Sequence, residues 1–91
     1  MAIKTDSSQV VMYASKLCGY CTRAQRLLKG KTDKLSIIYT DGNPKMRTEL
    51  KSKTGSHTVP QIWIGDKYVG GCDDLFQLDG LKKLDAMLEA L

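Results

Sequence analysis

The chain has 91 residues, of which 14 are Lys or Arg and 10 are Asp or Glu, giving a net charge of +4. This length fits a single domain over residues 1–91 and exceeds the roughly 40 residues below which disulfides or metals are usually needed for folding. The basic residues are scattered, which does not indicate nucleic acid binding, and three cysteines do not make the disulfide framework of a small secreted protein.

The first nine residues, 1–9, lack the apolar run of a signal peptide. No uninterrupted apolar stretch elsewhere in the sequence is long enough to cross a bilayer. We therefore expect a cytoplasmic, monomeric protein that has no membrane partner.

The first predicted elements are a strand and a helix. Residues 9–14, QVVMYA, are short and rich in β-branched and aromatic types, which predicts a buried strand. From Cys18 onward, apolar residues recur at helical spacing, and Gly30 is a stop signal for the helix. The Cys18-Gly19-Tyr20-Cys21 motif therefore lies where a strand leads into a helix.

The middle of the chain repeats this order. Residues 36–40, SIIYT, predict a second strand, and residues 41–44 supply a turn, an N-cap and a proline suited to the first helical position. A helix over residues 44–54 follows and is closed by Gly55.

Two short strands, 61–64 and 67–70, are separated by Gly65-Asp66, a connection typical of a tight hairpin. Leucines at helical spacing then predict a last helix over about 81–91, preceded by a shorter helical piece that starts at Asp73 or Asp74 and is interrupted near Gly80. The order predicts an α/β fold with a mixed four-stranded sheet, opened by a right-handed crossover and flanked by helices.

The two cysteines of the motif are spaced for a disulfide, since residues three apart are neighbours on one side of a helix. Cys18 lies at the helix entrance, where free N–H groups and the helix dipole stabilise an anion, and Lys16 adds positive charge. Cys21 lies on the apolar face, where burial favours the neutral thiol. This asymmetry indicates thiol-disulfide exchange, with Cys18 as nucleophile and Cys21 as resolving thiol.

A zinc site is the structural alternative, because Cys18, Cys21, Cys72 and His57 together would make a Cys3His set. The second pair of ligands lacks the compact spacing of such sites, so we expect no metal site of this kind. Taken alone, His57 is interpreted as a loop residue. Cys72 has two open interpretations, an inert small residue or a part of the site.

Three motifs together carry a family resemblance: the CxxC, Thr58-Val59-Pro60 before the third strand, and residues 70–74, GGCDD, after the fourth. The chain resembles the glutaredoxins from about Val10 onward. Residues 58–75, TVPQIWIGDKYVGGCDDL, are similar to small bacterial dithiol glutaredoxins of the third type. The resemblance implies a thioredoxin fold with strand order 2-1-3-4 and a cis Pro60 beside the active-site sulfurs; read alone, Pro60 would simply start an edge strand.

The resemblance also implies glutathione as reductant and bound co-substrate, with disulfide-containing or glutathionylated proteins as substrates. An extended tripeptide can pair with the backbone of Val59, and the N–H groups of Cys72 and Asp73 can receive a carboxylate where glycines 70 and 71 allow close approach. The residues expected to contact glutathione are Lys16, Tyr20, Thr58, Val59, Pro60, Gly71, Cys72 and Asp73. From the residues alone, Asp73 is equally well interpreted as a helix N-cap, and Tyr20 as a partly buried packing residue.

The chain departs from the family pattern at three places. Gly19 replaces a common proline, Ser15 stands where Lys or Arg often contacts glutathione, and Ser56-His57 fill a gap where Arg is frequent. Lys16, Arg47 and Lys51 are therefore the candidates for the glycine carboxylate of glutathione. Gly19 also keeps open an alternative function, a [2Fe-2S] cluster held between two subunits by Cys18 and glutathione.

Overall fold

The computed structural model describes residues 3–91. Its elements in chain order are β1 (Val10–Ala14), α1 (Gly19–Lys29), β2 (Leu35–Tyr39), α2 (Pro44–Thr54), β3 (Gln61–Ile64), β4 (Lys67–Gly70), α3 (Cys72–Gly80) and α4 (Leu84–Glu89). The strands form one sheet in the order β2-β1-β3-β4. Strands β1 and β2 are parallel, and the other neighbours are antiparallel. The predicted mixed sheet and its order 2-1-3-4 are confirmed.

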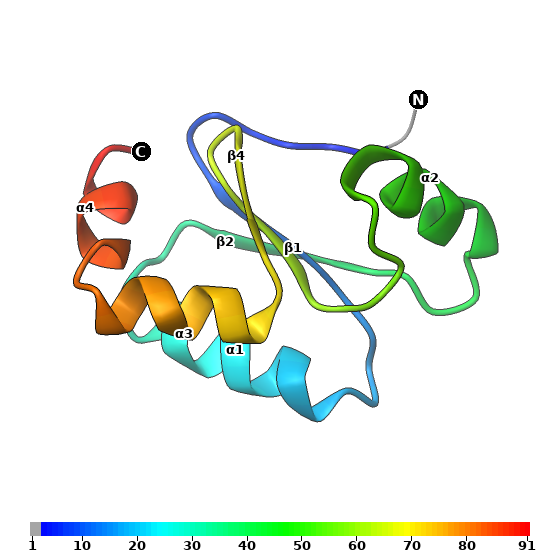
Figure 1. Ribbon diagram of the computed structural model, residues 1–91, viewed down its shortest axis with the longest axis horizontal. Coiled ribbons are helices and arrows are strands. Elements are labelled where there is room, and N and C mark those ends of the chain that lie inside the picture. Colours follow the sequence, from blue (N-terminus) through cyan, green and yellow to red (C-terminus); the bar gives the residue numbers. More distant parts are fainter. Residues whose placement is uncertain (1–2) are drawn as a thin grey trace.

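Alternate residues of β1 pack on opposite faces of the sheet, as the strand period of two requires. Val10, Met12 and Ala14 join the larger core cluster, which contains residues of α1, α3 and α4. Val11 and Tyr13 join a smaller cluster with Leu50 of α2. Helices α1 and α3 therefore cover one face and α2 the other, and Figure 1 shows α1 and α3 running alongside each other below the strands.

Local signals place most element ends where the sequence predicts them. The Asn43 side chain accepts the Met46 N–H at 3.1 Å and caps α2, Pro44 opens this helix, and Gly55 closes it in the left-handed conformation with φ of 81°. The turn between β3 and β4 uses Gly65 at a φ of 60°. The second helix and the hairpin are thus confirmed with their predicted bounds.

Several boundaries differ from the predictions, including the start of β1, which lies at Val10 and not at Gln9. Strand β2 covers Leu35–Tyr39, one residue earlier than expected. Helix α3 begins at Cys72 and has 9 residues, whereas α4 has only 6, so the expectation of a shorter piece before a longer last helix is wrong. The leucine periodicity misled the prediction because Leu81 caps the end of α3 and is exposed, outside α4.

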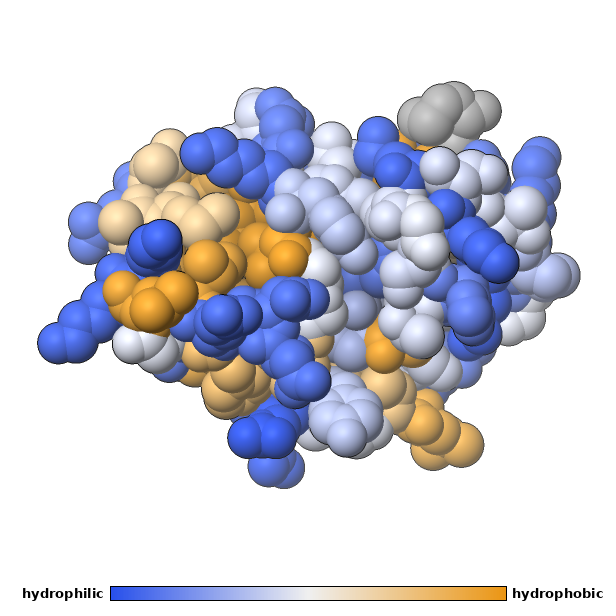
Figure 2. All heavy atoms as spheres, viewed as in Figure 1, coloured by the Kyte–Doolittle hydropathy of each residue, from blue (hydrophilic) through white to orange (hydrophobic). Residues whose placement is uncertain are grey.

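The surface seen from the same direction is uneven. Figure 2 shows hydrophobic residues gathered over α3, α4 and the β3–β4 hairpin, whereas hydrophilic residues cover most of the rest of this face. In the part of the chain that is described, no helix combines the length and the apolar character that crossing a membrane requires.

Candidate active site

The Cys18-to-Cys21 motif forms the entrance to α1. Cys18 is the N-cap, and its sulfur accepts a hydrogen bond from the Cys21 N–H at 3.1 Å. The N–H groups of the first turn of a helix, which lack intrahelical partners, lie at this position. All three cysteines are free thiols, and Cys18 is the one that is partly exposed. Cys18 is therefore the accessible thiol of the motif.

Cys21 has the opposite environment. Its side chain is buried in the main core cluster. Burial, together with the hydrogen bond and charge interaction with Cys18, raises the pKa of the Cys21 thiol to about 12. Cys21 thus remains a neutral thiol next to the more exposed sulfur.

The loop before β3 approaches the nucleophile from the other side of the site. The Val59–Pro60 peptide bond is cis, which confirms the isomer implied by the family resemblance. The Cys18 thiol points to the Val59 carbonyl oxygen, with 3.9 Å between sulfur and oxygen. Residues 41 positions apart in the sequence are thereby brought into contact.

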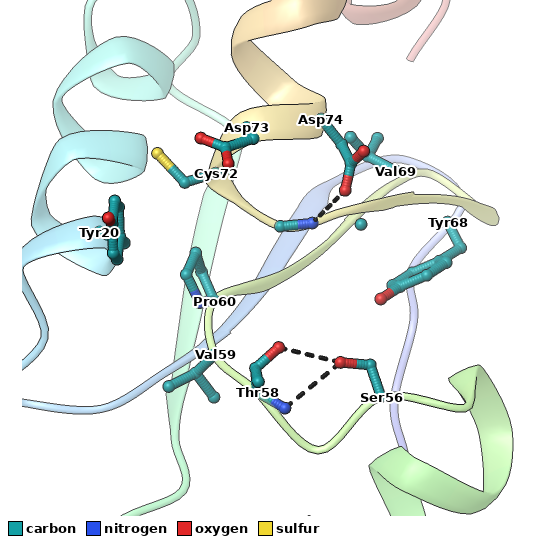
Figure 3. A pocket seen from close by; sticks show the side chains of 12 residues that line it. Tyr20, Ser56, Thr58, Val59, Pro60, Tyr68, Val69, Cys72, Asp73 and Asp74 are labelled. Atoms are coloured by element: carbon teal, nitrogen blue, oxygen red, sulfur yellow. Dashed lines mark hydrogen bonds between the residues drawn. The ribbon is translucent and has the colours of Figure 1, made fainter.

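A groove of about 510 Å³ runs along this loop and over the start of α3. Figure 3 shows Tyr20 on the opposite side of the groove from Tyr68, with Val59, Pro60 and Cys72 between them. Cys18 is not part of the lining, but its sulfur contacts the carbonyl oxygen of Val59, which is. The groove is lined by Tyr20, Ser56, Thr58, Val59, Pro60, Tyr68, Val69, Gly70, Gly71, Cys72, Asp73 and Asp74.

The start of α3 supplies donors at one wall of the groove. Gly71 is the N-cap, so Cys72 and Asp73 are the first helical residues, and backbone N–H groups in a helix's first turn lack intrahelical partners. Such groups bind anions. The Asp74 carboxylate accepts the Gly71 N–H at 3.0 Å. The interpretation of Asp73 as N-cap is therefore wrong, because α3 begins at Cys72 and Gly71 is its N-cap.

Cys72 lies in the lining of the groove, with its side chain buried. Burial is the main cause that raises the pKa of its thiol. The structure thus places Cys72 beside the site as a neutral thiol, and its backbone N–H is among those at the start of α3.

Lys16 lies outside the groove lining. Its ammonium group is 5.9 Å from the centre of the Tyr39 ring, and its backbone N–H donates to Asp41. Arg47 and Lys51 are exposed on α2 and also lie outside the lining. The roles proposed for these three cations in binding the glycine carboxylate stay predictions.

The residues of the zinc alternative do not form a ligand cluster. Within residues 3–91, no group of three or more His, Cys, Asp and Glu side chains is placed to hold a metal ion. His57 is exposed, whereas Cys21 and Cys72 are buried.

Sequence reasoning missed part of the groove. Ser56, Tyr68, Val69 and Asp74 line it, but none was assigned a contact with glutathione. It also missed Gln61, which is buried at the start of β3 although its side chain is polar. A glutamine heading the apolar strand QIWI was the available signal for a buried hydrogen-bonding role.

Comparison with known proteins agrees with this geometry. A family model described as Glutaredoxin matches residues 10–69. A glutaredoxin of Pseudomonas aeruginosa is 53% identical over 81 residues, covering 89% of this chain and 96% of that protein. Glutaredoxin 3 of Escherichia coli is 40% identical over 82 residues, covering 90% and 99%.

Among solved structures, a crystal structure of a buckwheat glutaredoxin-glutathione complex superposes with a TM-score of 0.84 at 31% identity, covering 88% of this chain and 76% of that chain. The similarity therefore extends to the sheet order and to the flanking helices. With a family model over residues 10–69 and relatives matched over nearly their whole length, the chain belongs to the glutaredoxin family.

Proposed function

We propose that this protein is a glutathione-dependent thiol-disulfide oxidoreductase that reduces protein disulfides and protein-glutathione mixed disulfides. The observation that carries the proposal is the placement of the Cys18 sulfur between the Cys21 N–H and the Val59 carbonyl, at the edge of the groove. The glutathione bound to the related buckwheat protein supports glutathione as the ligand.

The first step is attack by the Cys18 thiolate on one sulfur of the substrate disulfide. A bond forms between Cys18 and that sulfur, the substrate's S–S bond breaks, and the other sulfur leaves as a thiolate that takes a proton. With a glutathionylated protein, attack on the glutathione sulfur leaves glutathione attached to Cys18. A second glutathione thiolate then attacks this mixed disulfide, releasing oxidised glutathione and restoring the Cys18 thiolate.

With a protein disulfide, Cys21 is needed. Burial is the largest cause that raises the pKa of the Cys21 thiol, and the hydrogen bond and charge interaction with the Cys18 sulfur add to it. Both contributions from Cys18 are relieved when that sulfur enters a mixed disulfide. Cys21 then attacks the Cys18 sulfur, and its proton passes to the substrate thiolate that leaves as the mixed disulfide breaks. Two glutathione molecules reduce the resulting Cys18–Cys21 disulfide to two thiols and are released as oxidised glutathione.

The groove offers two features that suit glutathione. The backbone of Val59 can pair with an extended peptide, and the N–H groups of Cys72 and Asp73 can receive the carboxylate at its γ-glutamyl end. The Asp73 carboxylate is then available for the ammonium group at the same end. The sulfur of a peptide held this way lies near Cys18.

The test is a glutathione-coupled assay on two substrates, a glutathionylated peptide and a protein disulfide. Wild type should reduce both, Cys18→Ser neither, and Cys21→Ser only the glutathionylated peptide. Cys72→Ser is the matched control, since it removes a thiol beside the groove that the scheme does not use. Reduction of the glutathionylated peptide by Cys18→Ser would contradict the mechanism.

A second candidate function, an iron-sulfur cluster carrier, is favoured by one observation. A side chain added at Gly19 would meet no atom within 4 Å, so the space next to the partly exposed Cys18 is open. With Cys21 and Cys72 buried, each chain offers one accessible thiol, which fits a cluster shared by two chains with glutathione completing the ligands. Anaerobic reconstitution with glutathione should then give visible absorption bands and a dimer on gel filtration; their absence excludes this function.

A further inference from the structure

The side chain of Gln61 is a buried hydrogen-bonding centre next to the groove. The residue is only 1% exposed. Its Nε2 donates to the carbonyl oxygens of Ser56 at 2.6 Å and Thr58 at 2.9 Å. Its Oε1 accepts from the hydroxyls of Thr54 at 2.9 Å and Tyr68 at 3.4 Å. These four contacts use both donors and both acceptor positions of the carboxamide.

The partners of Gln61 belong to the wall of the groove. Ser56, Thr58 and Tyr68 all line it, and the Ser56 and Thr58 hydroxyls are 2.9 Å apart. The Thr58 N–H also donates to the Ser56 hydroxyl at 3.3 Å, and Figure 3 shows both contacts at the bend of the loop. The carboxamide therefore ties together the loop after α2 and the exposed tyrosine of β4.

The loop held by Gln61 leads directly to the contact with the nucleophile. The Thr58 carbonyl is bound by Gln61, and the next carbonyl along the chain, that of Val59, faces the Cys18 sulfur. Two consecutive peptide groups are thus fixed between a buried amide and the reactive thiol. Any rotation that releases Thr58 also moves the backbone of Val59.

We propose that Gln61 is a positioning residue for glutathione binding. Its carboxamide holds the Ser56-to-Thr58 segment so that the Val59 backbone is ready to pair with the extended peptide beside Cys18. This inference rests on the proposed function. A carboxamide is required because no other side chain of this size offers two donors and two acceptors, and a buried carbonyl left without its donor is costly.

A purely structural role predicts a different outcome from a positioning role. If Gln61 only stabilises the fold, its replacement lowers the melting temperature and leaves the kinetics of the remaining folded protein unchanged. If it positions the loop, replacement weakens glutathione binding in the folded protein. The KM for a glutathionylated peptide, read separately from kcat, distinguishes the two.

The experiment compares Gln61→Leu and Gln61→Glu with Ile64→Ala, a buried control at the opposite end of β3. Each variant is assayed well below its melting temperature. Loss of the buried hydrogen bonds should raise the KM for the glutathionylated peptide about tenfold in Gln61→Leu, with kcat unchanged. Ile64→Ala should lower the melting temperature while leaving KM unchanged. A wild-type KM in folded Gln61→Leu would overturn the proposal.

Two further measurements keep the test decisive. Thr54→Val removes the hydroxyl that lies 2.9 Å from Oε1 and that also contacts the Ser56 backbone, and it should raise KM in the same direction by a smaller factor. Amide hydrogen exchange at Thr58 and Val59, measured without substrate, should accelerate in the Gln61 variants and not in Ile64→Ala. Unchanged exchange refutes the role of Gln61, whereas failure of wild type to reduce the peptide refutes the proposed function instead.

Discussion

The sulfur of Cys18 accepts a hydrogen bond from the backbone N–H of Cys21, with 3.1 Å between the two atoms. This bond links the two cysteines of the motif and gives them opposite chemistry. The sulfur at the helix entrance accepts this bond and is partly exposed, whereas the second thiol is buried in the core. This arrangement supports the proposed roles, attack by the Cys18 sulfur and resolution by Cys21.

The raised pKa of Cys21 predicts a difference in alkylation. With iodoacetamide, we expect Cys18 to be modified at neutral pH and Cys21 to stay unmodified until the pH approaches about 12, the pKa that burial gives it. Peptide mapping by mass spectrometry after short exposures at rising pH measures both rates. Equal rates at neutral pH would contradict the assignment of roles.

The same pKa has a consequence for stability. The folded-state pKa of Cys21, about 12, exceeds its ordinary value of 9.0, so the folded chain holds this proton more tightly than the unfolded chain does. The associated stabilisation is complete below about pH 9 and is lost as the pH rises towards 12. Urea unfolding across this range should show the decline in wild type, and a smaller one in Cys21→Ala.

Asp41 connects the segment before the nucleophile to the start of α2. Its carboxylate accepts the Ser15 hydroxyl and the Lys16 N–H, each at 3.1 Å. Asp41→Asn should loosen this segment and lower the rate at which Cys18 reacts. Faster hydrogen exchange at Lys16 is the direct measurement, and Asp33→Asn, in the α1–β2 connection, gives the same charge change as a control. Unchanged exchange at Lys16 in Asp41→Asn would count against this connection.

The contacts of Asp41 also depend on pH. Burial alone would raise the pKa of this carboxyl, but the hydrogen bonds from Lys16 and Ser15 outweigh it and lower the pKa below 3.8. The carboxylate's contribution to stability is therefore present above the ordinary pKa and is lost as the pH falls through the lowered one. Acid unfolding of Asp41→Asn should lack this component.

Gly70 is a position where only glycine fits. Its φ is 115°, and a Cβ there would collide with the Asp74 carboxylate that binds the Gly71 N–H. Gly70→Ala should therefore destabilise the fold by about 1–3 kcal/mol and weaken glutathione binding at the start of α3. Gly80→Ala is the matched control, because a Cβ at Gly80 meets nothing within 4 Å. Thermal unfolding that ranks the two variants alike would contradict this expectation.

Leu17 lies immediately before the nucleophile and is 100% exposed, and Tyr20 beyond it is 63% exposed. A protein substrate reaching Cys18 would cover this leucine, but a small mixed disulfide in the groove would not. Leu17→Ser should reduce turnover of a protein disulfide about tenfold and leave that of glutathionylated peptide unchanged. Leu81→Ser, an equally apolar change at an exposed leucine after α3, is the control. An equal loss on both substrates would show that Leu17 acts on the chemistry instead.

The sequence alone was sufficient for the local features of this protein. Helix α2 begins at Pro44 behind its Asn43 cap and ends at Gly55, and the β3–β4 hairpin turns at Gly65, because these signals act within a few residues. The position of Cys18 at the entrance of a helix followed from the same short-range patterns.

Only the tertiary structure decided which distant residues meet. The Val59 carbonyl reaches Cys18 across 41 positions, the groove extends to Ser56 and Tyr68, and Lys16 turns to Tyr39 instead of the groove. These contacts depend on how loops pack against the sheet, which periodicity and capping do not specify. Gln61 shows the reason most clearly: its polarity was visible in the sequence, but its role comes from four partners that the fold gathers around it.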